Sequence, residues 1–219
     1  ISSYISSLFP IRFAIFPSYS VGWMLSEESF MKNLKFIDML KIRGSWGKIG
    51  DDNVGGRWLY ADQWAYQNSN TYMGSTSATK TPYSYYRISS LGNNNISWET
   101  VEKRNLGIDY SFLNGLVSGS VDIFNDDRTD ILVSGGSRAI PSYFGVTPPT
   151  ANIGRVKSKG YEFEIKLNYT FNNKMHVWLN TNLTHAENEV IFRDDPELTQ
   201  AHRKAQGYAI GQTKTYIDN

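Results

Sequence analysis

The clearest indication of the fold is the segment KSKGYEFEIKLNYTFNNKMHVWLNTNLTH, residues 157–185. In its first half, every second residue from Tyr161 to Phe171 is apolar or aromatic, and Lys159 precedes them in the same alternation. The residues between them are polar, apart from one glycine. Successive side chains of a strand point to opposite faces, so this pattern predicts a strand with one apolar and one polar face. It is longer than the roughly 5–6 residues usual in a sandwich. It suits a wall between lipid and water, which needs roughly 9–11 residues per tilted strand.

A tight turn and a return strand complete this hairpin. Asn172-Asn173 predicts the turn, because asparagine tolerates the left-handed backbone that short hairpin turns require. The return segment places Val177, Leu179 and Leu183 on one face and asparagines and threonine on the other. Both strands of the hairpin are therefore expected to separate an apolar from a polar environment.

The same alternation predicts further strands at residues 15–26, 40–49, 98–112 and 116–129. Asn114-Gly115 lies between the last two and is the strongest short hairpin signal in the chain. After the first strand, Ser26 is a candidate N-cap for one or two helical turns within 27–39.

The connections fall into two kinds that alternate along the chain. Long segments at 50–95, 134–152 and after 187 alternate with tight ones at 27–39, 113–115 and 172–173. The first long segment contains an aromatic group and a polar run at 68–79. In an up-and-down meander, all long loops would meet at one rim and all short turns at the other. That asymmetry is typical of outer-membrane barrels and has no counterpart in a Greek-key sandwich.

Composition narrows the function classes. The net charge of +1 gives no electrostatic case for a nucleic-acid partner, and the absence of cysteine excludes disulfide scaffolds and thiolate metal sites. Aromatic residues make up 14% of the chain, with 14 Tyr and 6 Trp. Interfacial girdles of a membrane barrel would produce this excess, and so would a carbohydrate-binding sandwich.

No motif points to catalysis or to a metal. Asp51-Asp52-Asn53 lacks EF-hand spacing and is better interpreted as a turn that ends a strand. Glu162 and Glu164 lie on one strand, whereas a glycosidase needs carboxylates on facing elements. The three histidines show neither ligand spacing nor a triad order and are interpreted as rim or loop residues; they are His176, His185 and His202.

Several runs of the sequence resemble one family in the right order along nearly the whole chain. They are IFPSYSVGWMLSEESFM (15–31), LKIRGSWGKIGDDN (40–53), ISWETVEKRNLGIDYSFLNGLVSGSVDIFNDDRTDIL (96–132), IPSYFGV (140–146), ANIGRVKSKGYEFEIKLNY (151–169) and GYAIGQT (207–213). These runs resemble the SusC/RagA family of TonB-dependent outer-membrane transporters of Bacteroidetes-type Gram-negative bacteria. The most specific parts are Trp98-Glu99-Thr100, Asn105-Leu106-Gly107-Ile108-Asp109, and Asn152-Ile153-Gly154 with Lys159-Gly160-Tyr161-Glu162.

The resemblance implies an all-β, antiparallel, up-and-down transmembrane β-barrel of roughly 22 strands, closed by a plug. Residues 1–219 would be part of that one barrel domain, with about seven or eight strands, and the plug domain and C-terminal strands would lie outside this chain. The implied function is TonB-dependent uptake of glycans or peptides across the outer membrane. The implied partners are a SusD/RagB-like surface lipoprotein lid, the TonB complex of the inner membrane, and outer-membrane lipid. No cofactor and no enzymatic activity are expected.

Three groups of residues carry the functional expectations. Membrane-interface anchors are expected at Trp23, Trp46, Tyr110, Tyr161 and Phe171. The loop aromatics either stack on a sugar or peptide ligand or pack the loop onto its neighbours or the lid; they are Trp58, Tyr60, Trp64 and Tyr66. Polar residues on the opposite face of the strands are expected to line the water-filled lumen of the barrel; they are Asn105, Asp109, Ser118, Ser120, Asp122, Glu162, Glu164, Asn180 and Asn182.

Two rival functions make opposite structural demands. A secreted β-sandwich that binds glycans requires the apolar faces of its strands to meet in a dry core. A β-rich glycosidase requires two carboxylates that converge in one cleft.

Overall fold

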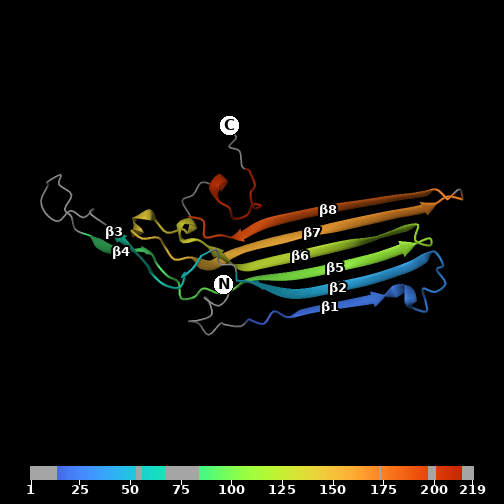
Figure 1. Ribbon diagram of the computed structural model, residues 1–219, viewed down its shortest axis with the longest axis horizontal. Coiled ribbons are helices and arrows are strands. Elements are labelled where there is room, and N and C mark those ends of the chain that lie inside the picture. The colour runs from blue at the N-terminus through green and yellow to red at the C-terminus, as the bar shows by residue number, and fades with distance from the viewer. Residues whose placement is uncertain (1–13, 53–55, 68–83, 173, 197–200, 214–219) are drawn as a thin grey trace.

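A computed structural model describes residues 14–52, 56–67, 84–172, 174–196 and 201–213. Six long antiparallel strands form one sheet, in the order β1-β2-β5-β6-β7-β8 (Figure 1). Their bounds are β1 Ser18–Met24, β2 Ile37–Asp51, β5 Glu99–Phe112, β6 Val117–Val133, β7 Ala151–Thr170 and β8 His176–Phe192. The expected antiparallel meander is therefore confirmed, with each strand of the sheet beside its neighbour along the wall.

The strands are longer than their apolar parts. The strand expected at 116–129 continues to Val133, and the polar residues 187–192, expected in a loop, belong to β8. Alternation of hydrophobicity marks only the segment that needs one apolar face, whereas the hydrogen-bonded ladder continues through charged residues beyond it. In contrast, β1 is shorter than residues 15–26, because Pro17 lies just before it and a 3₁₀ turn follows it.

Short and long connections lie at opposite ends of the sheet (Figure 1). The β1–β2, β5–β6 and β7–β8 connections meet at one end, here called the short-turn end. The long segments between β2 and β5, between β6 and β7, and after β8 meet at the other, here called the long-loop end. The asymmetry expected from the sequence is confirmed.

One short connection differs from the expected chemistry, and part of another lies outside the described residues. The 3₁₀ turn η1 covers Leu25–Glu27, so Ser26 lies inside it, and Met24 occupies the N-cap position without a side-chain cap. In the β7–β8 turn, the positive φ of 66° belongs to Lys174, and Asn173 lies outside the described residues. The Asn114-Gly115 turn is present as expected, with φ of 55° and 79°, and Leu113 joins it at 57°.

The long segment between β2 and β5 contains a second, separate sheet. Strands β3, Gln63–Gln67, and β4, Tyr85–Ser90, pair as an antiparallel hairpin beyond the long-loop end of the wall (Figure 1). The expectation of an irregular segment is therefore wrong for these residues, while the polar run at 68–79 lies outside the described part. The main ladder is undisturbed by this excursion, since Asp51 still pairs with Glu99.

No dry core forms among the described residues. The buried hydrophobic side chains are Ile96, Val101, Val133 and Val190, and none with relative exposure below 2% is found in the described part. The other helical segments are short 3₁₀ turns: η2 Gly135–Ser137, η3 Ser142–Phe144 and η4 Ala201–Arg203. None of the helices in the described ranges has the length and hydropathy needed to cross a membrane.

Candidate functional site: two faces of the sheet and the outer loops

One face of the sheet carries a continuous apolar band. Registered residues opposite each other share a face, and one row across the sheet holds Ile42, Ile108, Val121, Phe163 and Leu183. The rows on either side are also mainly apolar, with Gly44, Leu106, Ile123, Tyr161 and His185 on the long-loop side and Leu40, Tyr110, Gly119, Ile165 and Thr181 on the short-turn side. Within the described chain, no second sheet covers this face.

Exposure and height define what this band can contact. Ile123 is 60% exposed and Leu106 is 56% exposed. The ten residue-to-residue rises from Tyr161 to Phe171, at about 3.3 Å each, span about 33 Å, or about 25 Å at a strand tilt of about 40°. That is the height of the apolar band of a transmembrane barrel. A sandwich core is not found in the described part of the chain, because no second sheet there packs on the apolar face.

Aromatic residues lie near both ends of the band. Toward the short-turn end, Tyr110 lies two residues before the end of β5, and Phe171 lies in the β7–β8 turn. Trp23, the penultimate residue of β1, pairs with Ile42 and so lies in the central row of the band. Tyr161 lies in the last apolar row toward the long-loop end, and Trp46 lies in the next row. These five positions are the ones expected to act as interface anchors. Trp46 Nε1 donates to Glu102 Oε1 at 2.8 Å, and Trp23 Nε1 donates to Glu28 Oε1 at 2.9 Å.

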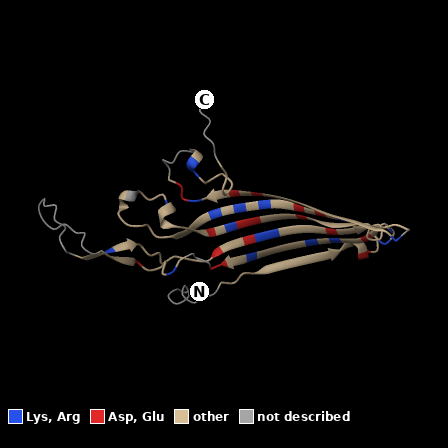
Figure 2. Ribbon diagram, turned by 45° about the horizontal axis from the view of Figure 1, so that its top comes forward, with Lys and Arg blue, Asp and Glu red and all other residues tan. Residues whose placement is uncertain are grey.

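Beyond the band, the same face becomes charged. The row that follows holds Trp46, Arg104, Asn125, Lys159 and Glu187, and the next holds Lys48, Glu102, Asp127, Lys157 and Glu189. In Figure 2, most of the charged bands lie in the half of the sheet nearer the long-loop end. Arg155 Nε donates to Asp127 Oδ1 at 2.9 Å, and this hydrogen bond lowers the pKa of the Asp127 carboxyl. The change from apolar to charged side chains marks a boundary between two media.

The opposite face of the sheet is polar and is organised around Arg43. Its Nε donates to Asp109 Oδ1 at 3.2 Å, and its Nη2 donates to Asp122 Oδ2 at 2.5 Å. Arg43 lies on β2 and Asp122 on β6, so the side chain reaches across β5, where Gly107 occupies the intervening position. A Cβ atom at Gly107 would lie 2.6 Å from Asp122 Oδ1 and 2.7 Å from Arg43 Cζ. The missing side chain is what leaves room for this bridge.

The remaining polar residues expected on this face lie there as a group. Lys166 Nζ forms an ion pair with Glu164 Oε1 at 2.9 Å. Glu162 lies two residues away on the same strand and is exposed. The others alternate on β5, β6 and β8: Asn105, Asp109, Ser118, Ser120, Asn180 and Asn182. Glu162 and Glu164 project from one strand, so they do not flank a substrate as a glycosidase pair does. Among the described residues, no cluster of three or more histidine or acidic residues could hold a metal.

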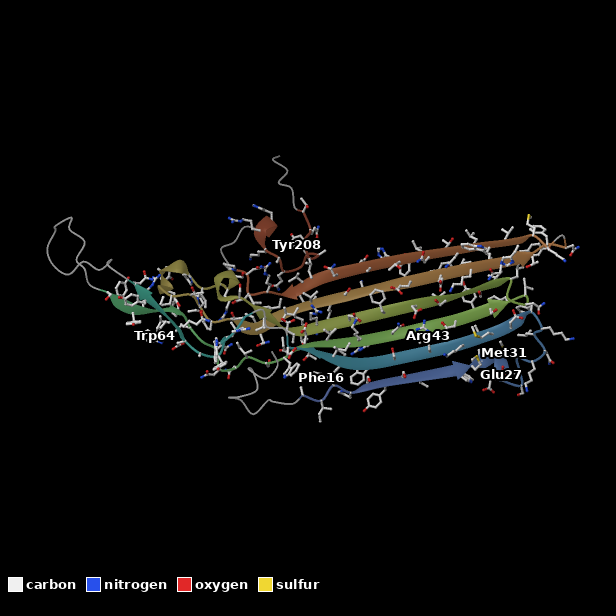
Figure 3. All side chains as sticks on the ribbon, viewed as in Figure 1. Phe16, Glu27, Met31, Arg43, Trp64 and Tyr208 are labelled. Atoms are coloured by element: carbon white, nitrogen blue, oxygen red, sulfur yellow. The ribbon has the colours of Figure 1, made fainter. Side chains whose placement is uncertain are left out.

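The loop aromatics fall into two groups. Trp64 and Tyr66 lie on β3 and are 63% and 54% exposed. Figure 3 shows Trp64 beyond the long-loop end of the wall. Tyr66 packs against Tyr86 of β4, with ring centroids 5.2 Å apart. Trp58 and Tyr60 form a separate pair with centroids 5.9 Å apart. Tyr86 was missed from the sequence, although its alternation with Ile88 in a short aromatic run is a strand signal.

The histidines and the Asp51-Asp52-Asn53 turn, for which no functional role is expected, lie apart from the Arg43 bridge and the loop aromatics. His176 lies at the start of β8 beside Thr170, His185 lies on the apolar side beside Tyr161, and His202 lies in η4. Asp51 is the last residue of β2, and Asn53 lies outside the described residues. The structure does not bring the histidines together.

A single antiparallel wall with one exposed apolar band, one polar face and all long loops at one end defines a segment of a transmembrane β-barrel. Residues 9–215 match the family described as TonB dependent receptor-like, beta-barrel. The chain belongs to this family, which consists of receptors and transporters and not of enzymes.

Named relatives and solved structures agree with that assignment. The chain is 31% identical over 203 residues to TonB-dependent receptor P39 of Formosa agariphila and 30% identical over 179 residues to TonB-dependent receptor SusC of Bacteroides thetaiotaomicron. These alignments cover 92% and 82% of the chain but 18% and 17% of the relatives, so the chain spans less than a fifth of their length. The fold is similar to the RagAB peptide importer in its open-open state, with a TM-score of 0.65 at 20% identity over 80% of this chain and 18% of that one.

Proposed function

We propose that this chain forms part of the barrel wall of an outer-membrane importer that takes up an oligosaccharide or an oligopeptide. The observation that carries the proposal is the pairing of an exposed apolar band with a polar face organised around Arg43 on the same strands. Lipid would cover the first face, and solute and water would pass along the second. The long loops would then face the outside of the cell, and the short turns the periplasm.

The proposed partners follow from the family. TonB would supply energy from the inner membrane, and a SusD/RagB-like surface lipoprotein would cover the long-loop end. Exposed rings on the β3–β4 hairpin would contact the solute or that lid, because aromatic faces stack on sugar rings and on peptide side chains alike. The similar RagAB structures are of a peptide importer, which supports peptides as one class of solute. The similarity to SusC does not distinguish peptides from oligosaccharides.

Uptake by intact cells tests this function. A strain that lacks the full-length receptor is expected to lose growth on one class of oligomer, either oligosaccharides or oligopeptides, when it is the only carbon source. The plasmid-borne receptor should restore growth only in the presence of TonB. Normal growth of the deletion strain on every solute tested, together with release of the receptor from membranes by sodium carbonate, would overturn the proposal.

The loop aromatics have a test of their own. Trp64→Ala combined with Tyr66→Ala is expected to raise the solute concentration needed for half-maximal growth about tenfold or more, since each stacked ring contributes about 1 kcal/mol. The matched control is Tyr169→Ala, which removes an exposed ring from the apolar face of β7, away from the proposed solute path. Equal effects of the two changes would remove the hairpin from the proposed solute path.

A further inference from the structure

A pocket of about 380 Å³ lies at the long-loop end of the sheet, where β6, β7 and β8 meet the segment that follows β8. Val133 and Val190 line it and are only 6% and 7% exposed. Val156, directly opposite Val190, lies on the same side of β7 as Glu162, so the pocket belongs to the polar face of the sheet. Its other apolar lining residues are Ile131, Leu132, Phe192, Ala205, Ala209 and Ile210. In the proposed importer, this pocket lies at the outer mouth of the solute path.

The segment after β8 is fixed to the end of that strand by backbone hydrogen bonds. Val190 N donates to Tyr208 O at 2.9 Å, and Gly207 N donates to Val190 O at 2.8 Å. Ile210 N donates to Asn188 Oδ1 at 2.7 Å. These bonds hold one wall of the pocket in place, so the pocket is already formed before a ligand enters, as is usual for binding sites.

The charged residues of the lining are two arginines. Among the described residues that line the pocket, Arg155 and Arg193 carry charge and no carboxylate is present. Arg155 Nε donates to Asp127 Oδ1 at 2.9 Å, so this cation already has its counter-charge. Arg193 is exposed and forms no ion pair with any residue that the structure describes. The pocket therefore combines an apolar floor with one available guanidinium.

The two carboxylates that follow Arg193 in the chain have other partners. Asp194 Oδ2 pairs with Arg138 Nε at 3.3 Å. Asp195 Oδ2 accepts hydrogen bonds from two backbone N–H groups of the segment after β8, at 2.7 and 2.9 Å. An anion that binds Arg193 would not have to displace either carboxylate.

We propose that this pocket binds the carboxyl-terminal residue of an oligopeptide, an inference that rests on the importer function proposed above. The terminal carboxylate pairs with the guanidinium of Arg193, whose planar fork can donate two parallel hydrogen bonds to it. The apolar side chain of the same residue lies on Val133 and Val190. A neutral oligosaccharide carries no such anion, so the lining favours the peptide over the oligosaccharide. A free fatty acid shares the combination of an apolar group and a carboxylate, and the experiment separates the two.

Uptake of tritiated hexapeptides by cells that carry the full-length receptor tests the site. The probes contain glycine and serine and end in leucine, with either a free carboxylate or a carboxamide. At low peptide concentration, the unaltered receptor should take up the acid about tenfold faster than the amide, the effect expected of a hydrogen-bonded charge. Arg193→Gln should slow uptake of the acid about tenfold and leave that of the amide unchanged. Arg203→Gln is the matched control, because it changes an exposed cation of η4 outside the lining.

The apolar part of the pocket has its own measurement. The unaltered receptor should take up the leucine-ended acid about tenfold faster than a serine-ended acid, because one leucine side chain becomes buried. Ala209→Phe fills the pocket and should remove this preference, while the amount of receptor in the outer membrane stays normal. A preference that survives Ala209→Phe would overturn the proposal.

The remaining outcomes separate this inference from the proposed function. Equal uptake of acid and amide, or equal effects of Arg193→Gln and Arg203→Gln, would overturn the peptide site and leave the importer standing. Growth that depends on TonB with oligosaccharides alone would do the same. Uptake of decanoate that depends on Arg193, without such an effect on the peptides, would assign the pocket to fatty acids and overturn the proposal. Loss of all growth that depends on TonB would instead contradict the importer itself.

Discussion

Arg43 shows how one residue can connect three strands of the wall. Its guanidinium contacts Asp109 on β5 and Asp122 on β6, and Asp122 is only 7% exposed. A buried carboxylate without a counter-charge is strongly destabilising, so this contact matters more than an exposed ion pair would. Gly107 belongs to the same unit because the bridge passes over it.

Substitution of Gly107 should therefore weaken the wall. Gly107→Ala is expected to lower the unfolding free energy of the full-length receptor by about 2–4 kcal/mol, because the new Cβ displaces either Arg43 or Asp122. Urea titration in phospholipid vesicles, followed by tryptophan fluorescence, measures the change. Gly44→Ala is the control, since its Cβ would meet nothing closer than 3.8 Å. A loss of equal size in the control would show that the bridge is not the cause.

Neighbouring residues on β7 face different media. Phe163→Lys places a charge in the middle of the apolar band and should cost about 2–4 kcal/mol, the cost of lysine at a bilayer midplane. Glu162→Lys, one residue away on the polar face, should change stability by about 0.5 kcal/mol or less. The same urea titration measures both, and similar losses for the two variants would contradict the assignment of faces.

The sheet is built from hairpins, and backbone strain from positive φ angles is found in their turns. In the β5–β6 turn, Leu113, Asn114 and Gly115 all have positive φ. Leucine in this conformation costs about 1–2 kcal/mol, and its side chain is 52% exposed, so little packing offsets that cost.

Opposite substitutions in this turn should have opposite effects. Leu113→Gly is expected to stabilise the receptor by up to about 1 kcal/mol, because glycine adopts positive φ without steric penalty. Gly115→Val is expected to destabilise it by about 1–2 kcal/mol. Refolding yield in vesicles and the urea midpoint report both effects. Destabilisation by Leu113→Gly would mean that its side chain makes contacts in the assembled barrel.

Sequence patterns predicted these elements where one face had to be apolar. The strands around Leu106, Val121 and Phe163 were found because alternation there is strict. The ends of β6 and β8 were missed, since charged residues on both faces leave no periodic signal. The β3–β4 hairpin was missed because Trp64 and Tyr66 were interpreted as loop aromatics. The Arg43 bridge could not be predicted, because it depends on the register of three strands and on a glycine between them.

At the scale of the whole molecule, the sheet separates two environments along its entire width. The rows of the apolar band lie on one side of the sheet. All long segments meet at one end (Figure 1). Because no second layer covers the apolar face of the described sheet, its stability in isolation would be poor in water. The surrounding medium is therefore part of what holds the native state together.

Accessibility to a water-soluble reagent should alternate along β8. In a cysteine-free background of the full-length receptor, single cysteines at Asn180 and Asn182 should react with a charged maleimide in intact membranes. Cysteines at Leu179 and Leu183 should react about tenfold more slowly or not at all, because an apolar surrounding disfavours the thiolate. Equal reaction rates at all four positions would contradict a wall that separates lipid from water.

The excursion between β2 and β5 leaves and rejoins an intact ladder, with Asp51 still opposite Glu99. Lengthening such a closed segment costs only about 0.6 kcal/mol for each doubling. Lineages can therefore exchange, enlarge or shorten residues 52–98 with little penalty to the rest of the chain. Sequence divergence should accordingly accumulate in this segment, while the strands of the wall diverge more slowly because each must keep one apolar and one polar face.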